Sequence, residues 1–169
     1  MDYSGFLVLY SGGADSTLIL ARHKSARHLL HYTGMNAFKT KIAVANAMAL
    51  DRPINLRTIG EHPTRDGEVG LFHSLEDSLM VADAAIYAVK HGMKGLVLGF
   101  NKDDIGVTVK AIREIVAPVA PDFRIVEPLR DMPAKDVRMH LAEIAPDIPT
   151  VSCMIDRECG VCPKCRRGY

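Results

Sequence analysis

The chain has 169 residues, no tryptophan and only 6% aromatic residues, and it carries no surplus of either charge sign. Its 21 basic and 20 acidic side chains give a formal net charge of +1, so overall charge provides no attraction to nucleic acid or to an anionic membrane. No apolar run approaches the roughly 20 residues that a membrane-spanning helix needs, and the first residues lack the shape of a signal peptide. We therefore expect a cytoplasmic protein without a membrane partner.

The composition is that of a globular protein, with 48% hydrophobic and 24% charged residues. Short apolar runs alternate with segments of helical periodicity, which predicts an α/β fold: a five-stranded parallel sheet with helices on both faces. Ligands of such sheets bind beyond the carboxyl ends of the strands, where Ser11, Asn101 and the loop 60–71 should meet. We expect residues 1–150 to form this domain and residues 151–169 to form a C-terminal knot packed on it. The predicted strands are 6–10, 29–32, 54–59, 95–100 and 123–126, and the predicted helices are 15–23, 36–49, 75–90, 104–116 and 133–145.

A glycine-rich turn, Ser-Gly-Gly-Ala-Asp-Ser at 11–16, follows the first predicted strand directly. Its two glycines permit a tight turn and a close approach of the backbone to a ligand. The unpaired amides at the start of the next helix favour an anion there, and the hydroxyls of Ser11, Ser16 and Thr17 add donors. The turn matches neither the Walker A loop nor the dinucleotide-binding fingerprint. We predict a phosphate site, with a plain structural turn as the alternative.

All the cysteines of the chain lie close together near its C-terminal end, as Cys153, Cys159, Cys162 and Cys165. In the spacing C-x5-C-x2-C-x2-C, thiolates two residues apart can turn round one tetrahedral ion, and Gly160 loosens the backbone there. Disulfides, a redox-active C-x-x-C pair and an iron–sulfur cluster are the alternatives. We predict a structural Zn²⁺ ion on all four thiolates, which leaves no open ligand position for catalysis.

The turn at 11–16 resembles the S-G-G-x-D-S signature of the PP-loop ATP pyrophosphatases, also called the adenine nucleotide α-hydrolase-like family. With the four-cysteine knot, the chain resembles a short, divergent member of the 7-cyano-7-deazaguanine synthase family, and shorter matches fall at 32–34, 41–45, 84–88 and 127–129. The resemblance implies ATP and Mg²⁺ at the turn and release of AMP and pyrophosphate. It further implies that 7-carboxy-7-deazaguanine is adenylated, captured by ammonia as an amide, activated again and dehydrated to the nitrile of the queuosine pathway.

The resemblance also assigns residues. Asp15 and Ser16 are the expected catalytic residues, because Asp15 would order the loop or hold Mg²⁺ while Ser16 donates to a phosphate oxygen. His73, Asp103 and Asp104 are the expected substrate residues. The remaining histidines considered, at positions 31, 62 and 91, are expected on the surface or in loops, and a homodimer is expected. The ATP-binding residues implied are Tyr10, Ser11, Gly12, Gly13, Ala14, Asp15, Ser16 and Thr17.

The chain departs from this family where the substrate is bound. After the second predicted strand, residues 34–38 read Gly-Met-Asn-Ala-Phe where the family has Gly-Gln-Arg-His, and residues 73–77 replace a Pro-Gly-Arg-Asn stretch. A PP-loop enzyme with another acceptor is therefore an alternative, either a tRNA-thiolating enzyme or an amide-forming ligase such as an NAD synthetase. A zinc-ribbon module whose Arg166 and Arg167 contact nucleic acid is the non-enzyme alternative. We expect a small-molecule acid and ammonia, not nucleic acid, as partners.

Overall fold

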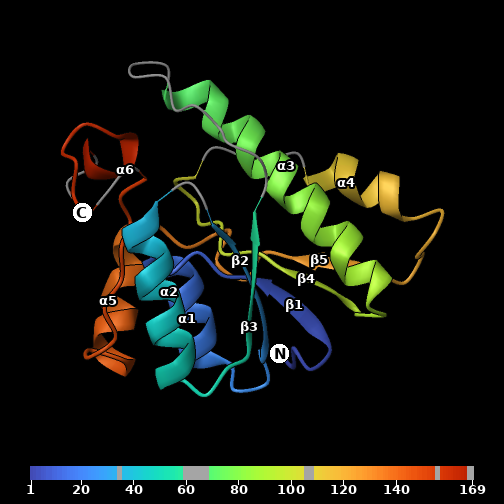
Figure 1. The fold of residues 1–169 in the computed structure, drawn as a ribbon, viewed down its shortest axis with the longest axis horizontal. Helices are drawn as coiled ribbons and strands as arrows, with labels where there is room; N and C mark the ends of the chain where they lie inside the picture. The colour runs from blue at the N-terminus through green and yellow to red at the C-terminus, as the bar shows by residue number, and fades with distance from the viewer. Residues whose placement is uncertain (34–35, 59–68, 105–108, 155–156, 167–169) are drawn as a thin grey trace.

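The computed structural model describes residues 1–33, 36–58, 69–104, 109–154 and 157–166, with backbone alone at 69–76 and 163. Five parallel strands form one sheet in the order β3-β2-β1-β4-β5 (Figure 1). The predicted parallel five-stranded sheet is therefore confirmed, and each strand overlaps its predicted segment. The strands are β1 (Phe6–Leu9), β2 (His28–Thr33), β3 (Ile54–Thr58), β4 (Gly95–Val97) and β5 (Arg124–Val126).

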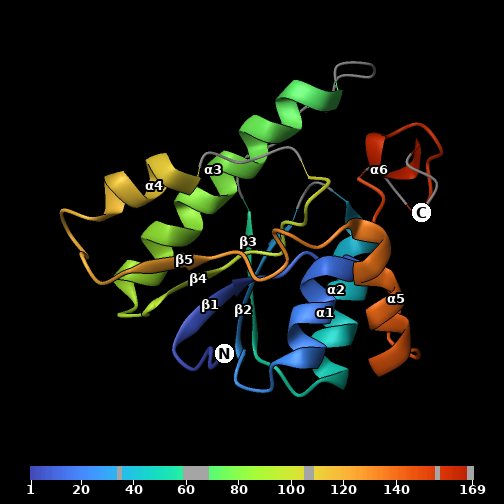
Figure 2. The same ribbon diagram turned by 180° about the vertical axis from the view of Figure 1, so that it is seen from behind.

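Helices cover both faces of the sheet, as predicted. One face carries α1 (Ala14–Arg22), α2 (Ala37–Ala49) and α5 (Ala134–Ile144), and the other carries α3 (Val69–Lys90) and α4 (Val109–Val116) (Figures 1 and 2). Alternating side chains of β1 supply both cores. Phe6 and Val8 pack with α1, α2 and α5, whereas Leu7 packs with α3 and α4.

The order of the strands creates a crevice beside β1. From β1 the chain builds β2 and β3 on one side, then returns to place β4 and β5 on the other side. The loops after β1 and β4 therefore diverge above adjacent strands, which is where open α/β sheets bind their ligands. Residues 10–16 follow β1 and residues 98–104 follow β4, so both segments reach this crevice.

Two helices begin elsewhere than predicted. Helix α3 begins at Val69 and not at Leu75, so His73 lies in this helix and not in the loop before it. Apolar residues continue the helical spacing upstream of Leu75, and Gly70 costs the helix only about 1 kcal/mol relative to alanine. Helix α4 begins at Val109, and residues 105–108 of its predicted span lie outside the described residues, as do residues 60–68 of the predicted loop.

The segment that leads to the cysteines is bound to α2 and to the turn after β1. Asn46 donates its side-chain amide to the Pro149 carbonyl over 2.7 Å, and the Val151 N–H donates to the Gly12 carbonyl over 3.1 Å. Asn36 caps α2 by accepting from the Lys39 N–H, and its side-chain amide donates to the Cys153 carbonyl over 3.4 Å. Within the described part of the chain, every helix is too short or too polar to cross a membrane.

Candidate functional site

The turn after β1 is closed by its own side chains. The hydroxyls of Ser11 and Ser16 lie 3.1 Å apart, and the Ser11 N–H donates to the Ser16 hydroxyl over 3.2 Å. The Gly13 N–H donates to the Ser11 hydroxyl over 3.2 Å, while the Ser16 hydroxyl reaches back to the Gly13 carbonyl over 3.4 Å. These bonds fix the turn at the N-terminus of α1 without any ligand, as a preformed phosphate site requires.

Glycines at two places are needed for packing around this turn. Gly12 has φ +75°, and a Cβ there would lie 3.1 Å from the Ala43 Cβ of α2. A Cβ on Gly99, which follows β4, would lie 3.0 Å from the Ser16 amide nitrogen. The backbone after β4 thus touches the first turn of α1. Sequence reasoning placed Gly99 near the expected substrate loop but gave it no packing role, although a glycine at the carboxyl end of a buried strand is a signal for such a close approach.

Tyr10 and Thr17, both predicted to bind ATP, bind each other. Their hydroxyls lie 3.2 Å apart, and both side chains are buried. Tyr10 lines the cleft described below, whereas Thr17 is not among the described residues that line it. Burial raises the pKa of Tyr10, so its hydroxyl stays protonated. The pair stiffens the junction between β1 and α1, and a direct contact of Thr17 with phosphate stays a prediction.

A cleft of about 170 Å³ opens at the carboxyl edge of β1 and β4. The turn residues Ser11, Asp15 and Ser16 form one wall, and β2, α2 and α3 contribute to the others. Sequence reasoning expected this position, at the edge where Ser11 and Asn101 meet. The charged residues that line the cleft are Asp15, Lys39, Asp77, Asp104 and Lys164.

Asp15 belongs to a chain of polar contacts that crosses the cleft. Asn101, which is buried, donates its side-chain amide to Asp15 Oδ1 over 2.6 Å. The backbone N–H of Asn101 donates to Asp104 Oδ2 over 3.1 Å, and Asp104 Oδ1 accepts from the Lys164 ammonium over 2.7 Å. Burial raises the pKa of Asp15, against the hydrogen bond from Asn101. Asp15 is therefore a carboxylate whose charge is costly until a cation joins it.

The three predicted substrate residues have different surroundings. Asp104 lines the cleft, while Asp103 accepts the Ala134 N–H over 2.8 Å and so caps α5. Asp103 is not among the described residues of the cleft. The His73 side chain lies outside the described residues, so its substrate role is neither supported nor opposed. Of the two described side chains in this group, Asp104 is the one that lines the cleft together with Asp15.

Two further residues of the cleft were not predicted as site residues. His31 was expected on the surface, but it is buried in β2, with Nδ1 2.8 Å from the Tyr10 carbonyl and Nε2 2.9 Å from the Thr40 hydroxyl. Burial lowers the pKa of His31, so the neutral imidazole is favoured. Lys39 stands in the first turn of α2. No sequence pattern singled it out, because a lysine in the first turn of a helix is ordinarily exposed.

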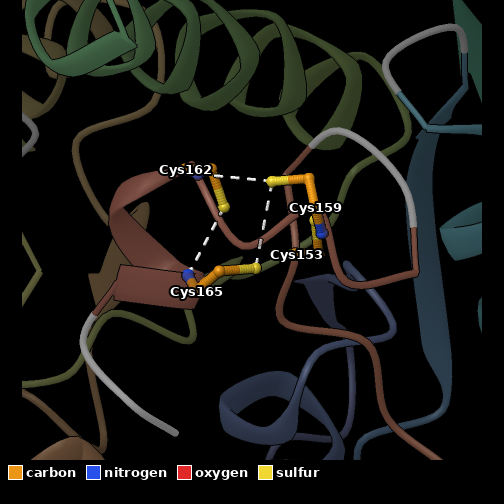
Figure 3. Close-up of side chains that lie close together, drawn as sticks. All are labelled: Cys153, Cys159, Cys162 and Cys165. Atoms are coloured by element: carbon orange, nitrogen blue, oxygen red, sulfur yellow. Dashed lines mark hydrogen bonds between the residues drawn. The ribbon is translucent and has the colours of Figure 1, made fainter.

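The four cysteine sulfurs all lie within 4.8 Å of one another (Figure 3). No disulfide joins these four thiols, which are all the cysteines of the chain. The N–H groups of Cys159, Cys162 and Cys165 each donate to the preceding cysteine sulfur of the set, over 3.3 to 3.4 Å. Such bonds favour thiolates, and Gly160 with φ +72° turns the chain between them. The four donors together could hold a metal, as predicted.

The knot, defined as residues 151–166, packs on α2. Its buried side chains Val151, Cys153 and Cys162 contact Phe38 and Ile42 of that helix. The Arg157 guanidinium lies 4.3 Å from the centroid of the Phe38 ring. Lys164 lies in α6 (Pro163–Arg166), and through this residue the knot forms part of the lining of the cleft. Polar contacts through Lys164, Asp104 and Asn101 thus connect the cysteine cluster to the Ser-Gly-Gly turn after β1.

Comparison with known proteins supports the fold. No protein-family model matches the chain, and no curated protein does either. Among solved structures, the chain is similar to the U34-tRNA thiolase NcsA from Methanococcus maripaludis with its [4Fe-4S] cluster, with a TM-score of 0.64 and 14% identity. That match covers 90% of this chain, which spans only 60% of the thiolase. A predicted subunit of tRNA methyltransferase from Methanocaldococcus jannaschii matches with a TM-score of 0.48, 20% identity and coverage of 82% of this chain and 73% of that one. The thiolase match shows that this chain shares the fold of a large part of that enzyme.

Proposed function

We propose that this protein is a PP-loop ATP pyrophosphatase that adenylates a carboxylate and releases AMP and pyrophosphate. The observation that carries the proposal is the Asp15 carboxylate, which Asn101 holds at 2.6 Å beside a preformed Ser-Gly-Gly turn in an open cleft. A turn that grips the β- and γ-phosphates holds the leaving group and exposes the α-phosphorus to an acceptor. The thiolase fold and the S-G-G-A-D-S sequence support the same assignment.

The residues of the turn have distinct tasks in this scheme. Ser16 and the first amides of α1 donate to pyrophosphate as charge develops on it. The absence of a side chain at Gly12 lets the turn pack against α2. The absence of a side chain at Gly99 lets the backbone after β4 pack against the first turn of α1. Asp15 is the residue that fits Mg²⁺, because its ionisation inside the cleft is unfavourable without a cation. When bound, Mg²⁺ would supply positive charge against the phosphates.

As acceptor we propose 7-carboxy-7-deazaguanine, on the strength of the sequence resemblance. The carboxylate attacks the α-phosphorus and expels pyrophosphate, which gives an acyl-adenylate. Ammonia then attacks the acyl carbon and expels AMP, which leaves the amide. A second ATP adenylates the amide oxygen, and loss of AMP and protons gives the nitrile. The overall reaction consumes two ATP and one ammonia for each nitrile formed.

For the four cysteines we propose one structural Zn²⁺ ion. At a Zn–S distance near 2.3 Å, tetrahedral thiolates stand about 3.8 Å apart. The Cys159 and Cys165 sulfurs lie 4.0 Å apart, and the whole set lies within 4.8 Å. A cluster of several irons needs a wider set, because its metals and sulfides stand between the thiolates. The similar thiolase holds a [4Fe-4S] cluster, so the iron–sulfur alternative has a precedent in the fold.

The test is product analysis with the full chain. The protein would be incubated with Mg-ATP, ammonium and 7-carboxy-7-deazaguanine, and the products identified by mass spectrometry. We expect AMP, pyrophosphate and the amide or nitrile, with zinc found by elemental analysis. Release of ADP and phosphate alone would overturn the adenylating function, and a brown protein with iron and sulfide would overturn zinc.

The second candidate is sulfur transfer to tRNA, which the fold of the thiolase favours. In that case ATP would adenylate a base oxygen of tRNA, and a sulfur donor would displace AMP. The chain offers no cysteine outside the knot to carry sulfur, and its net charge of +1 gives no general attraction to RNA. Incubation with tRNA, sulfide and Mg-ATP would separate the candidates, because a thiolated nucleoside in the digest would favour this second function.

A further inference from the structure

Two lysines from distant parts of the sequence line the same cleft. Lys39 stands in the first turn of α2, and Lys164 lies in α6 between Cys162 and Cys165. Both line the cleft together with Asp15. The fold thus brings two cations to face the turn that we assign to the phosphates.

Lys164 already has an anionic partner inside the cleft. Its ammonium lies 2.7 Å from Asp104 Oδ1, and the two side chains are 30% and 10% exposed. Asp104 is in turn held by the Asn101 N–H, and Asn101 by Asp15. Lys164 is therefore placed within the polar chain and cannot swing freely into solvent. An anion that entered the cleft would share this ammonium with Asp104.

Lys39 differs because it has no such partner. The part of the chain that the structure describes gives its ammonium no hydrogen bond and no ion pair, although the side chain is half-buried. Burial, together with the charge of Lys164, lowers the pKa of Lys39. The attraction of Asp77 and Asp15 raises this pKa and offsets the lowering only in part. A half-buried ammonium that forms no direct ion pair is a cost to the folded protein. An anion bound in the cleft would remove that cost.

We propose that Lys39 and Lys164 form a second anion subsite, separate from the amides of the turn. Its ligand is an anionic oxygen at the reacting centre, on either the α-phosphate of ATP or the carboxylate of the acceptor. The identity of these ligands rests on the proposed function, whereas the subsite itself rests on the two lysines. Lys39 supplies a charge that forms no direct ion pair with a described residue, and Lys164 supplies a charge positioned by the knot. The pair would both bind the reactants and stabilise the negative charge of the transition state.

Substitution of Lys39 is a suitable test, because its ammonium forms no hydrogen bond or ion pair with the described residues that the change could break. Lys39→Met would be compared with Lys41→Met, an exposed lysine of the same helix that does not line the cleft. Calorimetric titration of the full chain would use an uncleavable α,β-methylene ATP in one arm and 7-carboxy-7-deazaguanine in the other. We expect Lys39→Met to weaken at least one arm by about tenfold or more, with Lys41→Met close to wild type. The weakened arm identifies the anion, and equal affinities of both variants in both arms would overturn the subsite.

A third arm keeps this result distinct from failure of the proposed function. Inorganic phosphate, a single anion that can enter the subsite alone, should raise the melting temperature of the wild type and of Lys41→Met, but raise that of Lys39→Met by clearly less. If the wild type binds neither ATP nor the acid, the proposed function fails, and this arm still decides the subsite. Lys164→Met should weaken the same ligands while it keeps its metal. A loss of metal without a loss of anion affinity would assign Lys164 to the knot alone and overturn its part in the subsite.

Discussion

The phosphate turn and the cysteine knot meet at one cleft, but they hold their shapes by different means. The turn is braced by hydrogen bonds among Ser11, Gly13 and Ser16 and sits on a helix with a fully buried face. Among its described residues the knot buries Val151, Cys153 and Cys162, and most of its internal bonds are N–H donations to sulfur. The turn is therefore organised by the protein itself, whereas we expect the knot to depend on the metal that we propose for it.

The turn is therefore the preformed part of the site, whereas the shape of the knot depends on the proposed metal. Asp15 belongs to the preformed part, at the start of α1. Lys164 belongs to the knot, between Cys162 and Cys165. The ion pair between Lys164 and Asp104 connects the two parts. Unfolding of the knot should therefore change the positions of charged groups in the cleft. The four predictions that follow test this division, beginning with the largest effect.

Cys159→Ser should abolish metal binding and unfold the knot locally, because structural zinc contributes on the order of 10 kcal/mol to such sites. The sheet should stay folded, since it has its own cores on both faces. Elemental analysis and amide hydrogen exchange of residues 151–166 would measure both effects. Ser152→Ala, which changes a neighbour that is no ligand, is the control and should keep one metal per chain. Protection of the knot in the metal-free variant would show that the knot folds by packing.

Asp15→Asn should lower ATP turnover by about 100-fold or more, yet stabilise the ligand-free protein. Because burial raises the pKa of Asp15, its contribution to stability is full below the unfolded value of 3.8 and is lost as the pH rises through the folded value. The asparagine has no charge and keeps the oxygen that accepts from Asn101. Its melting temperature should exceed that of the wild type at pH 7, and the gap should close below pH 3.8.

The exposed carboxylate Asp122 gives a matched control for this change, because Asp122→Asn removes a charge outside the cleft. It should alter neither turnover nor melting temperature by much. A melting temperature of Asp15→Asn below that of the wild type at pH 7 would contradict the cost we assign to the buried carboxylate.

Gly12→Ala should destabilise the protein by about 1–3 kcal/mol, through both a left-handed φ and a contact of 3.1 Å with Ala43. Gly160→Ala in the knot has a similar φ of +72° but meets nothing within 4 Å. It should cost only about 1 kcal/mol. Denaturant unfolding of both variants compares a packed turn with an open one. Equal costs would mean that the contact with α2 is relieved by a small movement.

The smallest expected effect concerns His31, which supports the backbone just before the turn. Burial lowers its pKa below the unfolded value of 6.5, so the neutral form is preferred in the folded protein. Its contribution to stability is full above pH 6.5 and declines as the pH falls below that value towards the folded one. His31→Gln should remove this part of the pH dependence, measured as the difference between the two unfolding curves from pH 7.5 to pH 5. If the stability of the wild type and of His31→Gln changed with pH in parallel, the pH dependence would come from a group other than His31.

The sequence predicted those parts of the site whose residues are close together in the chain. The turn at 11–16 and the four cysteines are local patterns, and their chemistry limits the shapes they can adopt. The sheet was also predictable, because buried parallel strands appear as apolar runs between helical segments. The first residue of α3 was not predictable. Gly70 is typical of a loop, but the helix contains it and begins at Val69.

The walls of the cleft could not be predicted in the same way. His31, Lys39 and Lys164 come from β2, α2 and α6. Only the strand order brings them together, and that order is decided by packing between distant segments. His31 illustrates the difficulty, because a histidine in a short strand gives no sign of its burial until its two ring contacts are known.

One short bond gives the molecule a further property. The Val151 N–H donates to the Gly12 carbonyl, so the strand of chain that leads into the knot is fastened to the turn itself. Two ligands that bind to parts joined in this way obey thermodynamic reciprocity. If the metal raises the affinity for ATP by some factor, ATP must raise the affinity for the metal by the same factor. A cell short of metal would then lose it last from those copies of the protein that are occupied by nucleotide.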